Sequence, residues 1–177
     1  HPQLKSAAEF NEECRRVEKA SPILGCYDQS VSAIYIYNVA NPELDGVKEV
    51  TASHEMLHAA YARLSAEEKS RLEPLLEQAY QKVKTDKFTE RMNYYERAQP
   101  GSRTNELHSI LGTEFADLGS ELEQHYTRYF SDRSAVVKLH AQYSNKFDSV
   151  ENEASSLRTN LAARKLDIES RANQYAA

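Results

Sequence analysis

The segment at residues 51–64, TASHEMLHAAYARL, limits what this chain can fold into more than any other stretch. It contains the pattern HExxH, formed by His54, Glu55 and His58. In an α-helix, residues four apart lie one above the other on the same face, so a helix here would let both imidazoles bind a single metal ion. Glu55 would then lie beside the open position of the ion, where a carboxylate can take a proton from an activated water. The motif therefore requires a helix and suggests a metal site on it.

The residues around the motif favour this helix. Asp45 and Gly46 end a loop, and neither Pro nor Gly follows before Ser65. Apolar side chains recur at helical spacing, at Val47, Val50, Leu57 and Tyr61. The same pattern also describes an amphipathic helix that carries two solvated histidines and no metal.

A third ligand has to come from another part of the chain, because catalytic zinc takes three protein ligands and keeps a fourth position for water. Residues 104–130, TNELHSILGTEFADLGSELEQHYTRYF, predict a long helix with an apolar stripe. Glu106 and Glu114 fall on one face of that helix, with Asp117 three residues further on. These carboxylates are the natural candidates for the missing ligand.

One class of metallopeptidase does not fit. A metzincin needs Gly at position 61 and His at position 64, where this chain has Tyr61 and Leu64. HEMLH and the later NELHSILGTEF instead resemble the gluzincin type of zincin metallopeptidase, in which a Glu on a later helix is the third ligand. The resemblance does not reach the first 30 or the last 45 residues.

That resemblance implies a set of roles. His54, His58 and Glu106 would hold one Zn²⁺ per chain, and Glu55 would act as general base and then as general acid. Glu106 also lies in the first helical turn after a flexible loop, a place that the helix dipole makes favourable for an acid even without a metal.

The sequence offers several candidates for the residues that would support the metal ligands or stabilise the transition state. Glu114 is an alternative ligand or a carboxylate that supports one of the ligands, and Asp117 could orient a ligand histidine through its other ring nitrogen. A group that stabilises the oxyanion of the transition state is also needed, usually Tyr, His or Arg. The candidates are Tyr94, Tyr95, His108 and His125. His108 is also the next candidate for the third ligand after Glu114, but it lies about 200° round the helix from Glu106 and cannot share its face.

The N-terminal part of the chain carries one strong strand signal. Residues 4–20 have helical spacing and predict a helix, and Gly25 marks a turn. Residues 31–39, VSAIYIYNV, predict a strand with isoleucines alternating against tyrosines. This strand could be an edge strand along which an extended peptide pairs, or an ordinary strand of a small sheet.

Further helices follow the motif. Ser65 and Glu68 form the signature of a capping box, which opens a helix through about Lys84. Pro74 predicts a kink or a break within it. Residues 85–102 look less regular and end at the loop signal of residues 99–101, Gln-Pro-Gly.

From residue 131 onward a heptad pattern begins. Its members follow alternating steps of four and three, at Val136, His140, Tyr143, Phe147, Val150, Ala154, Leu157, Leu161, Arg164, Ile168, Arg171 and Tyr175. The polar members weaken this seam. The pattern predicts a long helix or helical hairpin that pairs with another chain, folds onto the first domain or serves as a stalk. His140 is expected to be a packed or partner-facing residue and not a ligand.

The two cysteines, Cys14 and Cys26, have no CxxC spacing, so a cysteine zinc site is not expected. A disulfide between them would join the first predicted helix to the segment after it and would imply an oxidising compartment. Two separate buried thiols are the alternative. We favour the disulfide.

The composition and charge of the chain indicate which kinds of binding partner to expect. The net charge is -5 with no basic run, so nucleic acid is not an expected partner. No apolar stretch is long enough to cross a bilayer, and no signal peptide is present. The abrupt start at His1 suggests a fragment from which a signal or anchor has been removed. We therefore expect an extracytoplasmic or membrane-anchored protein, with a cytoplasmic location still open.

These features predict a predominantly helical α+β fold. A small zincin-like domain with a short sheet is expected in residues 1–130, and a coiled-coil-like helical region in residues 131–177. The expected function is zinc-dependent hydrolysis of a protein or peptide substrate. The alternatives are an inactive zincin-like module that binds a partner, or a second copy of itself, through the helical tail, and a structural protein in which HEMLH is accidental.

Overall fold

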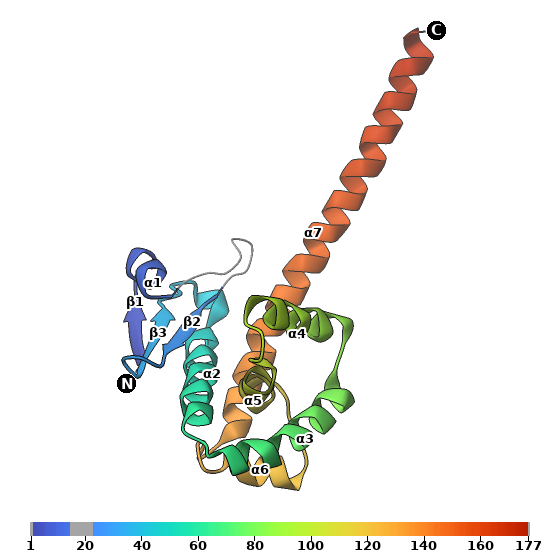
Figure 1. Cartoon of the computed structure of the whole chain (residues 1–177). Helices are drawn as coiled ribbons and strands as arrows, with labels where there is room; N and C mark the ends of the chain where they lie inside the picture. The colour runs from blue at the N-terminus through green and yellow to red at the C-terminus, as the bar shows by residue number, and fades with distance from the viewer. Residues whose placement is uncertain (1, 15–22, 177) are drawn as a thin grey trace.

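The computed structural model describes residues 2–14 and 23–176. Within them the chain forms seven α-helices, a short 3-10 helix and a three-stranded sheet, which confirms the predominantly helical α+β class (Figure 1). In chain order the elements are β1 (Pro2–Lys5), α1 (Ala7–Glu13), β2 (Gly25–Asp28), β3 (Ala33–Tyr37), η1 (Pro42–Leu44), α2 (Val47–Ala62), α3 (Ala66–Val83), α4 (Asp86–Ala98), α5 (Arg103–Glu114), α6 (Ser120–Tyr126) and α7 (Arg133–Ala176).

The sheet is small, and β3 lies in its middle, between β1 and β2. β1 runs parallel to β3, and β2 runs antiparallel to it. The strand predicted at residues 31–39 is confirmed in its central part. The suggestion that it is an edge strand is wrong, because β1 and β2 occupy both of its sides. Each of these outer strands has four residues, too few to give a clear pattern in the sequence.

The alternation in β3 places a helix against each face of the sheet. Tyr35 forms a buried cluster with Phe10 and Cys14, and Cys26 and Tyr37 are among the partly buried residues packed against it. We call this group the sheet cluster. The isoleucines of β3 point to the opposite face, where α2 packs. α1, the sheet and α2 therefore form three layers (Figure 1).

The N-terminal segment differs from its prediction. The helix expected over residues 4–20 is wrong at its start, because Leu4 pairs with Ile36 in β1. α1 begins only after Ser6, which forms a capping box with Glu9. Residues 15–20 of the predicted helix lie outside the described residues. A four-residue strand that pairs with a distant partner overrides the local helical spacing.

Cys14 and Cys26 form a disulfide, as predicted. Cys14 follows α1 in an extended conformation, and Cys26 lies in β2. Gly25, expected in a turn, opens β2 instead. The disulfide therefore joins the end of α1 to an outer strand of the sheet.

The main core lies among the helices, with α2 and α5 packed side by side at its centre. Their contact depends on Gly112 of α5. A Cβ atom there would lie 2.5 Å from Leu57 Cδ1 and 2.7 Å from Tyr126 Cε1, so a larger residue would push the helices apart. This close approach brings α5 beside the HEMLH face of α2.

The helices after the motif follow their capping signals. Ser65 and Glu68 form the predicted capping box, and α3 continues through Pro74 without a break. The segment at residues 85–102 is more regular than expected. Thr85 caps α4 by accepting a hydrogen bond from the backbone N–H of Phe88.

The single helix predicted over residues 104–130 is wrong. α5 ends at Glu114, and α6 begins only at Ser120. Between them Asp117 and Gly119 adopt φ values of 55° and 93°, which interrupt a right-handed helix. Asp117 therefore lies in a connection and not on the helical face that carries Glu106.

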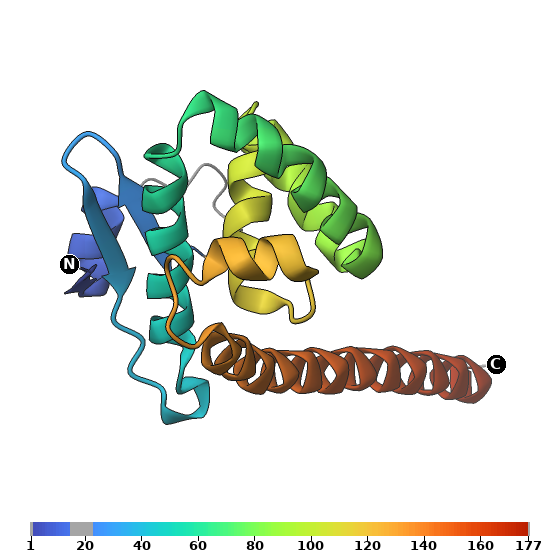
Figure 2. The same ribbon diagram turned by 90° about the horizontal axis from the view of Figure 1, so that it is seen from below.

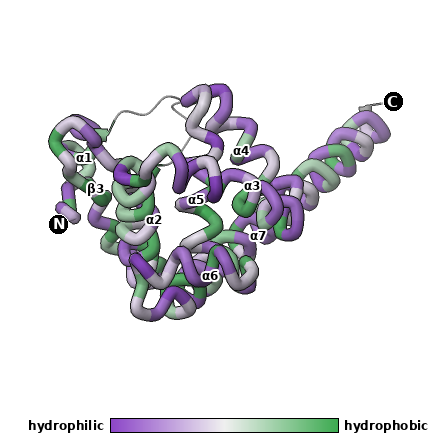
Figure 3. The backbone as a smooth tube through the Cα atoms, turned by 60° about the horizontal axis from the view of Figure 1, so that its bottom comes forward, coloured by the Kyte–Doolittle hydropathy of each residue, from purple (hydrophilic) through white to green (hydrophobic). Residues whose placement is uncertain are grey.

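α7 is one continuous helix. Its first turns pack against α2 and α5, and its far end projects away from the rest of the molecule (Figures 1 and 2). The heptad residues up to Tyr143 are half-buried, whereas those from Phe147 onward are exposed except for the half-buried Ala154. Figure 3 shows hydrophobic residues interspersed with hydrophilic ones along the projecting part. No helix in residues 2–14 and 23–176 combines the length and the hydrophobicity that a membrane crossing requires.

Candidate metal centre

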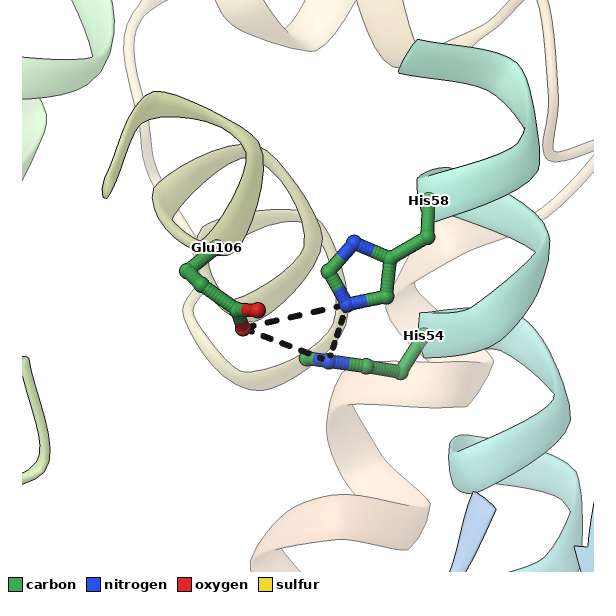
Figure 4. Close-up of side chains that lie close together, drawn as sticks. All are labelled: His54, His58 and Glu106. Atoms are coloured by element: carbon green, nitrogen blue, oxygen red, sulfur yellow. Dashed lines mark hydrogen bonds and ion pairs between the residues drawn. The ribbon is translucent and has the colours of Figure 1, made fainter. Parts of the chain in front are cut away.

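Three side chains from two helices converge where α5 passes α2. α2 places His54 and His58 one turn apart, with their Nε2 atoms 3.0 Å from each other. Glu106, in the first turn of α5, brings its Oε2 atom to 4.0 Å from His54 Nε2 and 3.7 Å from His58 Nε2. Figure 4 shows the three side chains pointing toward one another between the helices. Within the part of the chain that the structure describes, they form the one group of three or more potential metal ligands whose atoms lie within 4.8 Å of one another.

The spacing of these atoms suits a tetrahedral zinc ion. Zinc binds His nitrogen and Glu oxygen at about 2.0–2.2 Å, which places the ligand atoms of a tetrahedron about 3.4 Å apart. The separations of 3.0, 3.7 and 4.0 Å lie on both sides of that value. Small side-chain movements would therefore complete the coordination.

The surroundings also favour a cation. Burial lowers the pKa of His54 well below its usual value, and the nearby His58 and Arg91 lower it further. Burial lowers the pKa of His58 as well, so both imidazoles are neutral at pH 7. Glu106 is 5% exposed, and its Oε2 atom has no hydrogen-bond partner. A buried carboxylate oxygen that faces two neutral ring nitrogens is a favourable place for a metal ion.

Asn105 orients one of the ligands. Its Oδ1 atom lies 3.0 Å from His58 Nδ1 and, as an acceptor, selects the tautomer with a proton on Nδ1. The Nε2 lone pair of His58 is then free to bind a metal. Asn105 and Glu106 are consecutive residues. The same turn of α5 therefore supplies one potential ligand, Glu106, and the residue that orients another, His58.

Glu55 lies beside this group and is 7% exposed. Burial and the charge of Glu106 raise the pKa of Glu55 to about 8, while a hydrogen bond from the backbone of Tyr27 opposes the rise. Burial also raises the pKa of Glu106 to about 7, against the charge of Arg91. A bound divalent cation would favour the ionised forms of both carboxyls. Glu55 therefore has a proton affinity suited to taking and returning a proton near neutral pH.

The three potential ligands and Glu55 line a cleft of about 490 Å³. Residues 23–27, which include most of β2, line the same cleft. β2 pairs with β3 on one side only, so its other edge is free of strand partners in the described sheet. Further lining residues come from α4 and α7, among them Tyr94, Tyr95 and Tyr143. The cleft is thus built from both the sheet and the helices.

Glu114 lines this cleft but has other partners. Its carboxylate accepts hydrogen bonds of 2.7 and 3.0 Å from Arg91 and lies 3.4 Å from His140 Nε2. Glu114 is therefore outside the ligand group that Glu106 completes. Asp117 is exposed in the connection between α5 and α6 and does not line the cleft.

The four candidates for stabilising an oxyanion separate into two pairs. Tyr94 and Tyr95 line the cleft, and burial together with the charge of Glu106 raises the pKa of Tyr95. His108 and His125 face each other with their Nε2 atoms 2.9 Å apart, and neither lines the cleft. The tyrosines therefore share the cleft with the potential metal ligands, and the two histidines do not.

Three residues of the site were not predicted from the sequence: Arg91, Asn105 and Tyr143. Asn105 had a signal, since it can form hydrogen bonds and precedes a candidate ligand in the same turn. Arg91 and Tyr143 had none, because their positions depend on how α4 and α7 pack around α5.

The comparisons with known proteins identify no relative of this chain. No protein-family model, no curated protein and no solved structure matches the chain. The functional assignment therefore depends on the geometry of His54, His58, Glu106 and Glu55.

Proposed function

We propose that this protein is a zinc-dependent metallopeptidase. The observation that carries the proposal is the convergence of His54, His58 and Glu106, with a buried Glu106 oxygen that lacks any hydrogen-bond donor. Glu55 lies next to this group in the same cleft. The resemblance of HEMLH and NELHSILGTEF to gluzincin-type metallopeptidases points in the same direction.

The residues of the site have distinct roles in this proposal. Zinc, when bound by His54, His58 and Glu106, would polarise the scissile carbonyl and make a water nucleophilic. Glu55 accepts a proton from the attacking water and donates it to the leaving amine. Asn105 keeps His58 in the tautomer that binds metal. Tyr94 and Tyr95 are the candidates for donating a hydrogen bond to the oxyanion.

The substrate that fits the cleft is an extended peptide. The outer edge of β2 carries backbone N–H and C=O groups that a peptide can pair with as an added strand. β2 thus takes the role that the sequence suggested for the strand at residues 31–39. Substrate pairing along β2 would align a peptide bond with the ligand group that shares its cleft.

The test is hydrolysis of a library of internally quenched peptides by the zinc-loaded protein, with Glu55→Gln as the matched variant. The proposal expects turnover by the wild type and a rate lower by a factor of about 10² to 10⁴ in Glu55→Gln at equal zinc content. Turnover by the Glu55→Gln protein at the wild-type rate would contradict the role of Glu55.

The projecting half of α7 supports a second candidate, a metal-bearing module that binds a partner protein without turnover. Its heptad residues Val150, Leu157, Leu161, Ile168 and Tyr175 are between 53 and 86% exposed. Such an apolar stripe on a long helix is suited to pairing with another helix. Bound zinc with no hydrolysis of any library peptide would favour this candidate, whereas the absence of metal binding would favour a purely structural role.

A further inference from the structure

β2 approaches α2 more closely than a strand with a side chain at position 25 would permit. A Cβ atom on Gly25 would lie 2.6 Å from Thr51 Cγ2, 2.8 Å from Glu55 Cγ and 3.0 Å from Glu55 Oε1. Two of these distances are shorter than real Cβ atoms show. Gly25 is therefore needed for space, and the space that it leaves is filled in part by Glu55.

The backbone of β2 also faces Glu55. The backbone N–H of Tyr37 donates to the carbonyl of Leu24 at 2.8 Å, and antiparallel pairs alternate along the strands. The amides of Gly25 and Tyr27 therefore point away from β3, toward the free edge of the sheet. There the Tyr27 amide lies close enough to Glu55 to oppose the rise of the Glu55 pKa. β2 therefore approaches Glu55 both at Gly25, which has no side chain, and with the backbone amide of Tyr27.

A covalent bond fixes β2 in this place. Cys26 lies between Gly25 and Tyr27, and its side chain points to the opposite face of the sheet, where it is bonded to Cys14. Cys14 is 2% exposed in the sheet cluster, at the end of α1. The bond therefore ties the strand that contacts Glu55 to a buried point outside the helical core.

From these contacts we propose that Gly25 is a positioning residue for Glu55 and that the Cys14–Cys26 disulfide holds Gly25 in place. The potential metal ligands come from α2 and α5, and neither cysteine of the disulfide lies in these helices. Catalysis and metal binding are thus supported by different parts of the molecule. The catalytic half of this inference rests on the proposed function.

The first test is Gly25→Ala, assayed for zinc content and for peptide hydrolysis. The added methyl group has to displace Glu55 or β2, and a misplacement of about 1 Å lowers a rate by about 100-fold. We expect that loss to appear in kcat more than in KM, at unchanged zinc content. Gln3→Ala, in the other outer strand, is the control and should keep full activity. Full activity of Gly25→Ala would overturn the proposal.

The second test removes the disulfide with Cys14→Ser/Cys26→Ser. We expect this variant to keep its zinc and to lose kcat several-fold, because β2 is no longer tied to α1. Unchanged kcat would overturn the role of the disulfide. Loss of both zinc and kcat in this variant would overturn the proposal that metal binding and catalysis are supported by different parts of the molecule.

Crystal structures of the zinc-loaded wild type and Gly25→Ala separate this inference from the proposed function. A displaced Glu55 carboxylate with His54, His58 and Glu106 in place supports positioning by Gly25. An unmoved Glu55 overturns it. This readout holds even if the wild type cleaves no peptide, a result that would remove the peptidase proposal alone.

Discussion

The two regions that build the cleft are held together in different ways. The helical core buries large side chains from α2 to α6 and carries all three potential metal ligands. The sheet region has four- and five-residue strands, a cluster of three buried residues and a disulfide. It contributes the free edge of β2 and the contacts to Glu55. From this contrast we expect that mutations in the sheet region will affect the proposed peptide hydrolysis more than the proposed metal binding.

The largest effect is expected for Glu55→Gln. This change removes the proton acceptor and keeps the shape of the side chain, so hydrolysis should fall by a factor of about 10² to 10⁴. Zinc content should stay the same, because Glu55 is not among the ligands. Rates and zinc content measured on the same preparation check this expectation. Loss of zinc in this variant would show that metal binding and hydrolysis are not separable at Glu55.

Glu106→Ala should abolish most metal binding. Loss of a support residue lowers metal affinity by about 10- to 100-fold, so loss of a direct ligand should lower it by more than about 100-fold. Glu114→Ala is the matched control on the same helix, and it should keep the metal while losing the contact to Arg91. Competition with a zinc chelator measures both affinities. Equal loss in the two variants would contradict the assignment of Glu106.

Asn105→Ala should have a smaller effect on the same centre. Without the acceptor at Nδ1, His58 is free to change tautomer, and zinc affinity should fall by about 10- to 100-fold. Asn105→Asp keeps an acceptor and should restore binding. Nitrogen NMR of the His58 ring in the zinc-free protein reports the tautomer directly. If His58 keeps the same tautomer in the Asn105→Ala variant, this result would contradict the role of Asn105 in orienting His58.

The smallest effect is a pH dependence of stability in the metal-free protein. Burial raises the pKa of Glu55 to about 8 and that of Glu106 to about 7, so the folded state keeps protons that the unfolded chain has released. The free energy of unfolding should therefore fall as pH rises from about 7 to about 9, a range in which most histidines of the unfolded chain are already neutral. Urea unfolding at the two pH values measures the fall. Glu55→Gln should reduce it, and an equal fall in that variant would contradict the assignment.

The sequence was sufficient where a signal is local. The HEMLH helix needs only an uninterrupted helical stretch, and the capping box of Ser65 and Glu68 lies within one turn. Glu106 was predicted through a family resemblance and its place in a first turn, and the structure brings it to the two histidines. Such features depend little on the rest of the fold.

The sequence failed where distant segments decide. Leu4 lies in a strand because Ile36 pairs with it, and the central place of β3 follows from two neighbours that are too short to recognise. The break after Glu114 depends on the positive φ of Asp117, a conformation that only some Asp residues adopt. Arg91 reaches Glu114 only because α4 packs on α5. Each failure concerns a contact that local propensity does not encode.

The zinc content of the purified wild-type protein, determined by elemental mass spectrometry without chelator in the preparation, decides whether the proposed metal centre exists. We predict about one zinc ion per chain, held by His54, His58 and Glu106. A protein that contains no zinc and takes up none when zinc is added would contradict it.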